Sequence, residues 1–558
     1  MKAPRRGWAG LAVLTAAGLW AAAGDGRWGV AGRVSAGELE PPAVSVRGEV
    51  LDAATGKRVA ARVYIQGQDG TWHFPRSADP AGSAVAYRKQ RPDGIAEMHT
   101  TLSAHPFVID LPPGRYTLTV ERGKEYHAES RPFTVGAEPV DLSIELRRWI
   151  NLEQLGWYSG ETHVHGTLDE LPTLMLAEEL NVAFPLLYWV TEAFASPRTA
   201  ERSAAGDIEP KLIAVDATHV IYPRNTEYEI FSVGDERHTL GAFFVLNHQT
   251  LFDEGVPPVR PIADKAHGEG GLIELDKHNW PWSMALVPIM PVDLYELANN
   301  HVWRTEFGFG EFGEPAPEFM RVELDDRGFT ERGWIEYGFQ NYYTLLNCGF
   351  RLRPTAGTAS GVHPVPLGFG RVYVHLPDGF SYEAWLAGLN AGRSFVTTGP
   401  MLFVRVGGRE PGHTFKEDGP AAREYHVRGS ASSAQPLRAI EIVVNGEVVR
   451  TVVPENRKTE QDAFESRIDE KLAVDGSSWI AVRCFENRPD RRVRFAHSGP
   501  VHIDVAGKPL RPRREEVEFL IQRVESQIAR STGVLPKAAL DEYREALRIY
   551  RVIAETAR

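Results

Sequence analysis

Two histidines separated by one residue are the first group in this sequence that can bind a metal. His163 and His165 lie in the segment GWYSGETHVH, residues 156–165. At the end of a strand, residues two apart project to the same side, so both imidazoles can reach one ion. Neutral imidazole is a common protein ligand for zinc, iron and manganese-type sites. A His-x-His pair is weak support by itself, so the interpretation depends on the residues that follow it.

Further acidic and imidazole groups recur beside the apolar runs downstream. They are Glu227 and Glu229 after Ile221, His238 before the run 242–246, and His278 after the run 271–275. Each is placed where a strand would end in a layout of alternating strands and helices, and such barrels gather functional groups at the carboxyl ends of their strands. A solvated side chain explains any single member better than catalysis does. Together with the His-x-His pair they predict a metal-dependent catalytic centre.

Two cationic residues adjoin these groups. Lys277 precedes His278, and Arg224 precedes the acidic pair. Arginine can hold an anionic oxygen through two hydrogen bonds and lysine through its point charge, so both are candidates for binding an anionic ester substrate. Ordinary surface charges are the alternative. With His163, His165 and His278 they complete the set of candidate catalytic residues.

Several domains must position these groups. The chain has 558 residues, more than one hydrophobic core usually supports. Its composition, with 43% hydrophobic and 24% charged residues, is typical of a folded globular protein. The net charge of -12 provides no basic stripe, which argues against nucleic-acid binding.

Residues 1–36 are expected to be a cleavable export signal. Lys2, Arg5 and Arg6 precede an apolar run over 9–23, and small residues precede a cleavage position before Gly37. An uncleaved anchor is the alternative, but this run is shorter than the roughly 20 residues that span a bilayer. We therefore expect a secreted or periplasmic protein whose mature chain has no membrane span. Cys348 and Cys484 permit at most one disulfide.

Short alternating strands flank the region that carries the chemistry. Residues 41–148 predict a β-sandwich, in which DLPPGRYTLTV at 110–120 resembles carboxypeptidase-regulatory modules. We expect this module to be a spacer or a stabilising unit. After residue 405 the pattern predicts a second β-sandwich over 406–507, with a hairpin turn at Asn445-Gly446, and a helical hairpin over 508–558.

The order of motifs resembles the PHP (polymerase and histidinol phosphatase) metallohydrolase superfamily over roughly residues 149–505, with the barrel itself expected over 149–405. The matching segments are HVH at 163–165, Glu227, His238, GLIELDKH at 271–278, PVDLYELANN at 291–300 and NYYTLLNCGFRLRPTAGTAS at 341–360. The carbaryl-hydrolase-like CehA/McbA branch is the most similar one. The resemblance implies a multidomain α/β protein with a distorted (β/α) barrel that holds divalent metals for ester, phosphoester or carbamate hydrolysis. It also favours Glu227 over Glu229 as the bridging ligand, because of its spacing from His238.

Two departures from the family pattern reduce the number of metal ligands that the resemblance implies. Thr191-Glu192-Ala193-Phe194 stands where the family has Thr-Asp-His-Asn, and residues 357–361, GTASG, stand where it has Gly-Ser-Asp-x-His. His363 can replace a lost ligand if its loop is rearranged, and Glu192 can replace one from its own position. We therefore expect one or two zinc, manganese or iron ions per chain, held by a set drawn from His163, His165, Glu227, Glu229, His238, His278 and His363.

Two functions remain open at this point. The first is a secreted hydrolase of small-molecule or anionic esters that uses a metal-activated water. The second is a non-catalytic secreted protein of the same fold with a binding or surface-associated role. The sequence does not determine the substrate or the oligomeric state.

Overall fold

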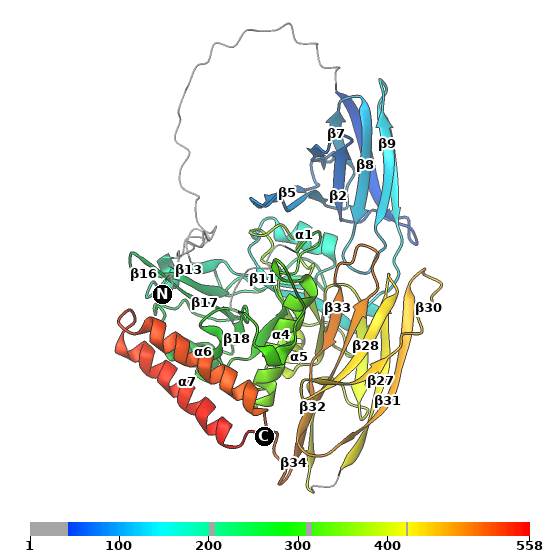
Figure 1. Cartoon of the computed structure of the whole chain (residues 1–558). Helices are drawn as coiled ribbons and strands as arrows, with labels where there is room; N and C mark the ends of the chain where they lie inside the picture. Colours follow the sequence, from blue (N-terminus) through cyan, green and yellow to red (C-terminus); the bar gives the residue numbers. More distant parts are fainter. Residues whose placement is uncertain (1–42, 200–206, 308–314, 420–421) are drawn as a thin grey trace, which may run out of the picture. The chain divides into compact units, whose positions relative to one another are not determined.

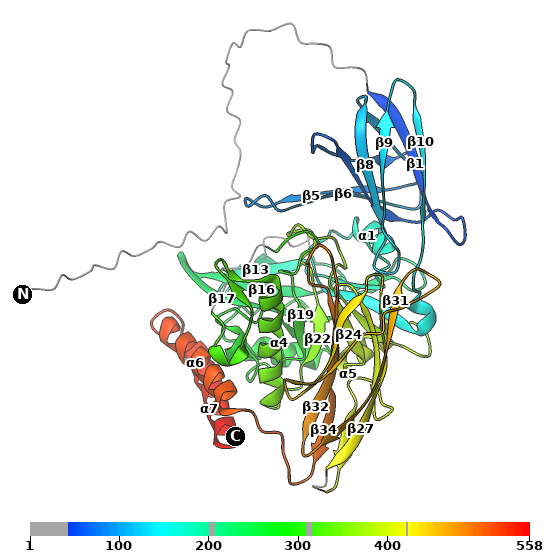
Figure 2. The same cartoon turned by 45° about the vertical axis from the view of Figure 1, so that its right-hand side comes forward.

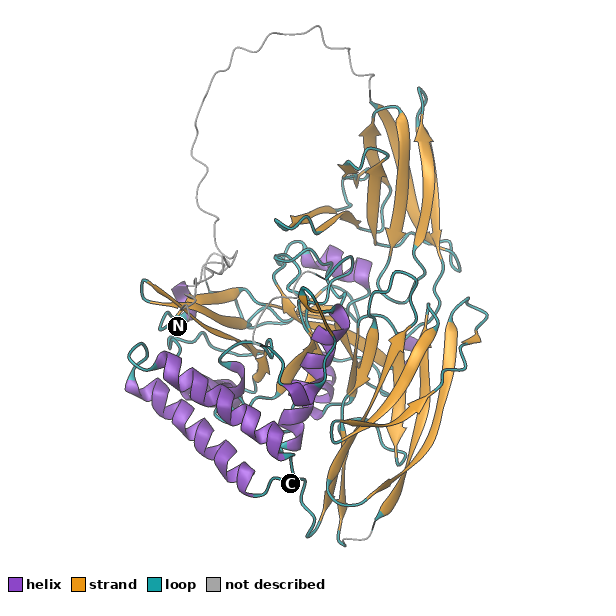
Figure 3. Cartoon of the chain, in the orientation of Figure 1, coloured by secondary structure: helices purple, strands orange, loops and turns teal. Residues whose placement is uncertain are grey.

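The computed structural model describes residues 43–199, 207–307, 315–419 and 422–558. The predicted export signal at 1–36 lies outside these residues. The described chain is rich in β-sheet and contains seven α-helices (Figures 1 and 3). None of these helices combines the length and the apolar character needed to cross a membrane. Cys348 and Cys484 are both free thiols.

The first ten strands form two sheets with a shared apolar core. One sheet has the order β10-β1-β7-β4, and the other has the order β5-β6-β2-β8-β9 with β3 paired to β2. In β8 the buried residues Tyr116, Leu118 and Val120 alternate with more exposed ones, as expected for a strand with one face on a core. The strands are β1 (Val44–Asp52), β2 (Ala61–Gly67), β3 (Trp72–His73), β4 (Arg76–Ser77), β5 (Ala84–Gln90), β6 (Ala96–Leu102), β7 (Phe107–Leu111), β8 (Gly114–Glu121), β9 (Glu129–Val135) and β10 (Val140–Leu146).

The strands that carry the predicted chemistry are divided between two further sheets. A six-stranded sheet has the order β13-β16-β17-β18-β19-β22, and β14-β15-β12-β11-β23-β24 belong to the other. A barrel closed as one hydrogen-bonded ring is therefore not confirmed. The strands are β11 (Trp157–Val164), β12 (Val182–Pro185), β13 (Tyr188–Glu192), β14 (Ile213–Ala214), β15 (Val220–Ile221), β16 (Thr226–Val233), β17 (Glu236–Leu246), β18 (Leu272–Leu275), β19 (Leu294–Ala298), β20 (Leu324–Asp325), β21 (Gly328–Phe329), β22 (Arg353–Ala356), β23 (Arg371–His375) and β24 (Ser394–Thr397).

The second of these sheets continues into the C-terminal β region, which the sequence predicts as a separate sandwich. Strand β24 pairs with β33 at Val396 and His497, and the twelve-stranded sheet extends through β32, β28 and β29. A four-stranded sheet, β25-β27-β31-β30, belongs to the same region. The strands are β25 (Met401–Val406), β26 (Thr414–Glu417), β27 (Arg423–Ser433), β28 (Leu437–Val444), β29 (Glu447–Val452), β30 (Arg457–Lys458), β31 (Phe464–Val474), β32 (Ser478–Glu486), β33 (Phe495–Ser498) and β34 (Val501–Val505).

The last two helices form a pair. In Figures 1 and 2, α6 and α7 lie side by side, as the helical spacing of their apolar residues predicts. The buried hydroxyl of Tyr550 on α7 donates to the carbonyl of Met284 at 2.8 Å, which attaches the pair to α3. The helices are α1 (Leu171–Glu178), α2 (Arg260–Gly268), α3 (Ser283–Leu286), α4 (Glu331–Asn347), α5 (Tyr382–Ala391), α6 (Arg514–Ser531) and α7 (Lys537–Glu555).

Candidate metal centre

The His-x-His pair lies where the two central sheets meet. His163 is buried in β11, and His165 follows the end of that strand. The backbone N–H of Ala359 donates to the carbonyl of His163 at 2.8 Å, and the N–H of His165 donates to the carbonyl of Ser360 at 2.8 Å. The segment after β22 thus runs against the end of β11 and fixes the backbone that presents both imidazoles.

Both histidines face one carboxylate on β16. Nε2 of His163 lies 3.8 Å from Oε1 of Glu227, and Nε2 of His165 lies 3.3 Å from Oε2 of the same residue. Glu227 is buried, with 1% of its surface exposed. The structure therefore brings together three of the residues that the sequence predicts as metal ligands.

The other ring nitrogen of His163 faces two acidic residues from neighbouring strands. Nδ1 lies 3.0 Å from Oε1 of Glu296, which is in β19, and 3.7 Å from Oδ1 of Asp276, which directly follows β18. Both carboxyl groups are completely buried. Asp276 stands at the carboxyl end of its strand.

Burial and neighbouring charges set the protonation of this group. Burial lowers the pKa of His163 to about 3, so its imidazole is neutral, the form that binds metals. Burial raises the pKa of Glu296, and the nearby Asp276 carboxyl raises it further. Burial opposes ionisation of Asp276 too, but Lys277 and His163 hold its pKa below the usual value. Lys277 forms an ion pair with Asp276.

The donor atoms around Nε2 of His163 fit a divalent transition metal. Ligands at about 2.1 Å from one ion lie roughly 3.0 to 3.4 Å from each other. The separation of 3.3 Å between His165 and Glu227 lies in this range, and that of 3.8 Å between His163 and Glu227 is longer. Two imidazoles and one carboxylate form an N and O donor set that suits zinc, manganese or iron. On the opposite side of the ring, Nδ1 can donate to Glu296. Metal-ligating histidines commonly make such a bond to a carboxylate, which fixes the tautomer and the ring.

Two more buried carboxyl groups hold the strands that carry the cluster. The side chain and backbone N–H of Thr358 both donate to Glu161 on β11. Thr162 and Thr355 donate to Glu274 on β18, at 2.8 and 2.5 Å. Burial raises the pKa of both Glu161 and Glu274 to about 8. These carboxyl groups link β11 to the residues around β22 and to β18. They therefore help to hold in place the strands that carry His163 and Asp276.

Two glycines allow the segment after β22 to approach the site. A Cβ atom at Gly357 would lie 2.2 Å from Oε1 of Glu296 and 2.2 Å from Cβ of His163. Gly361 has a φ of +100°, and a Cβ there would lie 2.6 Å from the carbonyl oxygen of His165. A histidine at position 361, where the family pattern has one, is therefore incompatible with this chain path.

Lys277 and Glu229 lie beside the cluster, whereas His278 is outside both groups of donor atoms. Both ring nitrogens of the buried His278 have no hydrogen-bond partner among the described residues, and its ring packs against Trp334 and Tyr337 at 4.7 and 4.9 Å. Nζ of Lys277 lies 4.0 Å from Oε1 of Glu229. Glu229 thus faces the lysine, while Glu227 faces the two histidines.

The two predicted replacement ligands have different positions. Glu192 is exposed at the end of β13. The ring of His363 lies 5.7 Å from that of Trp303, and burial together with the charges of Lys277 and Arg91 lowers its pKa to about 3. His363 is therefore near the cluster, but it is outside the group of donor atoms that surrounds His163.

A tyrosine from the N-terminal β region holds the segment that contains His363. The hydroxyl of Tyr87 on β5 donates to the carbonyl of His363 at 2.6 Å and accepts the N–H of Gly361 at 2.8 Å. The tyrosine ring stacks on His99 of β6, with ring centroids 5.0 Å apart. The expected spacer module thus also contacts a segment that forms part of the site.

The structure does not bring His238 or Arg224 to the cluster. Nε2 of His238 lies 3.3 Å from the hydroxyl of Ser531 on α6. The reason is strand direction: β17 begins at Glu236, and antiparallel pairing places Phe244, six residues after His238, opposite Glu227. Arg224 donates to the carbonyls of Ile208 and Gln249 and to Asp207. Neither side chain is available to the metal centre in this arrangement, which corrects the sequence-based assignment of both.

Asp276 and Glu296 belong to the site but are absent from the set of residues predicted from the sequence. Both lie within the segments GLIELDKH and PVDLYELANN, where acidic residues interrupt apolar strands. A carboxylate buried without a partner is costly, so an acidic residue inside such a strand indicates a partner or a metal. That signal was present in the sequence.

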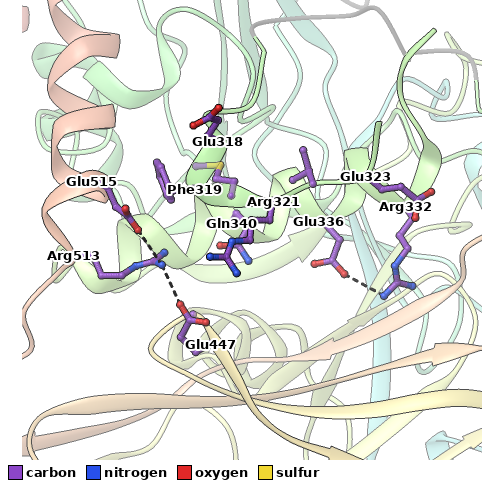
Figure 4. A pocket seen from close by; sticks show the side chains of 13 residues that line it. Glu318, Phe319, Arg321, Glu323, Arg332, Glu336, Gln340, Glu447, Arg513 and Glu515 are labelled. Atoms are coloured by element: carbon purple, nitrogen blue, oxygen red, sulfur yellow. Dashed lines mark hydrogen bonds and ion pairs between the residues drawn. The ribbon is translucent and has the colours of Figure 1, made fainter. Parts of the chain in front are cut away.

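A cavity of about 1050 Å³ lies elsewhere and does not include the metal cluster. Figure 4 shows its lining side chains, in which opposite charges pair with each other. Arg513 forms ion pairs with Glu447 and Glu515 at 3.1 and 3.2 Å, and Arg332 pairs with Glu336 at 3.4 Å. No predicted metal ligand lines this cavity, so it gives no support to the hydrolase interpretation.

Comparisons with known proteins add little. No family model and no curated protein matches the chain. A crystal structure of a two-domain protein that contains a predicted PHP-like metal-dependent phosphoesterase, from Bacteroides vulgatus, is similar at 10% identity and a TM-score of 0.27, over 61% of this chain and 95% of that one. A β-glucuronidase from Parabacteroides merdae is similar at 11% identity and a TM-score of 0.15, over 80% and 60%. At these TM-scores neither likeness supports a conclusion about this chain.

Proposed function

We propose that this protein is a metal-dependent hydrolase in which His163, His165 and Glu227 hold one divalent ion. The observation that supports this most directly is the convergence of two imidazoles on the buried carboxylate of Glu227, at 3.8 and 3.3 Å. Three protein ligands leave a coordination position open, which is the usual arrangement of a catalytic zinc. A structural zinc site would normally have a fourth protein ligand.

The surrounding side chains have separate roles in this proposal. Glu296 accepts a hydrogen bond from Nδ1 of His163 and so directs Nε2 toward Glu227. Asp276 binds the ammonium group of Lys277, which is almost completely buried. Lys277 thereby supplies a fixed positive charge beside the cluster, suited to an anionic oxygen of the substrate or of a transition state.

The proposed substrates are small esters, phosphoesters or carbamates. A divalent ion bound there would supply Lewis acidity toward a carbonyl or phosphoryl oxygen and would activate water for attack. The resemblance of the motif order to the PHP superfamily, and to its CehA/McbA branch, favours the same reaction class. The export signal predicted at 1–36 favours action in the periplasm or outside the cell.

The test compares two histidines of the same chain. Wild type, His163→Ala and His238→Ala are stripped of metal, reconstituted separately with zinc, manganese and iron, and analysed for bound metal. Each is then assayed on chromogenic phosphoesters, carboxylic esters and carbamates. We expect about one ion per wild-type chain, loss of both metal and turnover in His163→Ala, and wild-type behaviour in His238→Ala.

Two results would contradict the proposal. Absence of bound metal in the reconstituted wild type would reject the metal centre. Bound metal without turnover on any substrate class would reject hydrolysis and favour the non-catalytic binding protein instead.

A further inference from the structure

A second cavity, of about 660 Å³, is lined by several segments that are distant in the sequence. Its walls include residues 123–128 between β8 and β9, residues 304–305, and residues 488–494 between β32 and β33. No member of the proposed metal centre lines it. Its volume is within the range of about 300 to 1,000 Å³ that is usual for small-molecule sites.

Positive charge exceeds negative charge in the walls of this cavity. Six lining residues are cationic and three are acidic: Arg62, Lys124, Arg304, Arg488, Arg492 and Arg494 against Glu121, Glu486 and Asp490. The acidic groups are already engaged. Glu121 pairs with Arg62 and Arg304, and Glu486 and Asp490 both pair with Arg488. Most of the other cations pair with carboxyl groups outside the wall: Arg62 also with Glu178, Arg304 also with Glu97, and Arg492 and Arg494 with Glu331. Lys124 is the lining cation that this network leaves without a carboxylate among the described residues.

Lys124 is the least compensated of these cations. It has no ion-pair partner within the described part of the chain, and its ammonium donates only to the carbonyl of Thr398, at 2.9 Å. The ammonium lies 4.5 Å from the centre of the Phe369 ring, and the guanidinium of Arg494 lies 4.8 Å from the same ring. Burial lowers the pKa of Lys124 well below its usual value, and the charges of Arg371 and Arg494 lower it further.

Three polar atoms of the lining residues also lack partners. Nε of Arg62, Nε of Arg492 and the hydroxyl of Thr305 are buried, and none has a hydrogen-bond partner among the residues that the structure describes. Buried donors in folded proteins are nearly always satisfied, so such a group indicates a missing ligand or water. An anion with several acceptor oxygens would satisfy donors and balance charge at once.

We propose that this cavity binds a tetrahedral oxyanion, a phosphate or sulfate group, carried by a small organic molecule. Planar guanidinium groups hydrogen-bond such oxygens in pairs, and Lys124 adds a point charge. A water molecule occupies about 30 Å³ in the liquid, so the cavity has room for more than a single inorganic ion. Tyr126, Trp149 and Phe369 also line the cavity, and they offer apolar contact to the organic part.

Calorimetric titration of the metal-free full chain with inorganic phosphate, sulfate or chloride at constant ionic strength tests this site. We expect saturable binding of phosphate or sulfate, and none of chloride. Lys124→Gln should weaken this binding about tenfold, because a hydrogen bond to a charged group contributes roughly 1.5 to 3 kcal/mol. Lys471→Gln, which removes an exposed lysine of β31, is the matched control.

Two further variants show whether a loss of binding arises from this cavity. One guards against an effect on folding, and the other against an effect of the proposed metal centre. Thr305→Val removes one unpartnered hydroxyl with little change of volume and should also weaken binding. His163→Ala should leave it unchanged. The site is rejected if neither oxyanion binds saturably, if Lys124→Gln and Thr305→Val both bind as wild type, or if His163→Ala abolishes binding. A preference between phosphate and sulfate identifies which group the natural ligand carries.

Discussion

The hydroxyl of Tyr87 donates a hydrogen bond to the carbonyl of His363 at 2.6 Å, across 276 residues of sequence. The same hydroxyl accepts the N–H of Gly361, and this segment is hydrogen-bonded through Ser360 to the backbone of His165. The N-terminal β region therefore reaches the metal centre through one side chain and the backbone of one short segment.

Replacing Tyr87 with phenylalanine should loosen this segment without unfolding the protein. The variant loses two hydrogen bonds to backbone groups, each worth about 1 kcal/mol, but keeps the ring that stacks on His99. We expect about tenfold weaker metal affinity, with a small loss of thermal stability. Tyr116→Phe, which removes a hydroxyl bonded to Pro112 in the same region, should leave metal affinity unchanged. Equal affinities for wild type and Tyr87→Phe would show that the contact does not position the site.

Glu227 and Glu229 provide a paired test of the ligand set. Glu227 faces both histidines, whereas Oε1 of Glu229 lies 4.0 Å from the ammonium of Lys277. Glu227→Gln should abolish stoichiometric metal binding. Glu229→Gln should retain the metal and change mainly the Michaelis constant for anionic substrates, because it removes a charge beside Lys277. Metal loss in Glu229→Gln but not in Glu227→Gln would reverse the assignment.

The variant His363→Ala tests whether His363 replaces the missing family histidine as a metal ligand. Because the His363 ring packs against Trp303 outside the ligand group, we expect unchanged metal content and a modest change in rate. The measurement is elemental analysis beside a thermal melt, with His238→Ala as the control. Reduced metal occupancy at an unchanged melting temperature would instead assign His363 to the metal.

Gly357→Ala should damage the site although it adds only a methyl group. The new Cβ would lie 2.2 Å from both Glu296 and His163, so the strand ends must separate. Overpacking of this kind costs about 1 to 3 kcal/mol of stability. Urea unfolding and metal titration should both show a loss. Gly349→Ala meets no atom within 4 Å, but its φ of +92° makes it a control for backbone strain alone.

Acid should destabilise the C-terminal β region through His497. Its Nδ1 donates to the carbonyl of Ser498 and its Nε2 accepts from Tyr343, and burial lowers its pKa to about 3. In the unfolded chain the His497 imidazole is protonated below about pH 6.5. The free energy of unfolding that this histidine contributes is therefore fully present above that pH, and it falls by about 1.4 kcal/mol per pH unit between roughly pH 6 and pH 4. The urea midpoint of His497→Gln should be lower at pH 7 but should fall less steeply with acid. Equal slopes for both proteins would exclude His497 as the cause.

Three of the ligands in the proposed site were predictable from sequence because they follow a local rule. His163 and His165 are two residues apart beside an apolar strand, and Glu227 begins the next long strand of the region. Asp276 directly after an apolar strand and Glu296 inside one were equally visible, but their partner is a histidine more than a hundred residues earlier. No local pattern indicates which carboxyl group meets which ring.

His238 shows where sequence reasoning fails. Its position next to an apolar run indicated a strand end, but the strand begins before it and runs antiparallel to β16. Six residues of an extended strand span about 20 Å, which places this imidazole far from Glu227. The direction of a strand is set by its pairing partner and not by its own residues, so the sequence could not determine it.

The sheet shared by the central and C-terminal regions has a consequence for how this protein can be divided. A fragment that ends near residue 405 would include β24 but not β33, its neighbour through Val396 and His497. That fragment would expose a row of unpaired backbone N–H and C=O groups along β24, a strand that is buried in the whole chain, and such an edge is a template for aggregation. Strand β33 therefore covers this edge of the sheet that contains β11, and soluble fragments should be sought only among those that retain both β24 and β33.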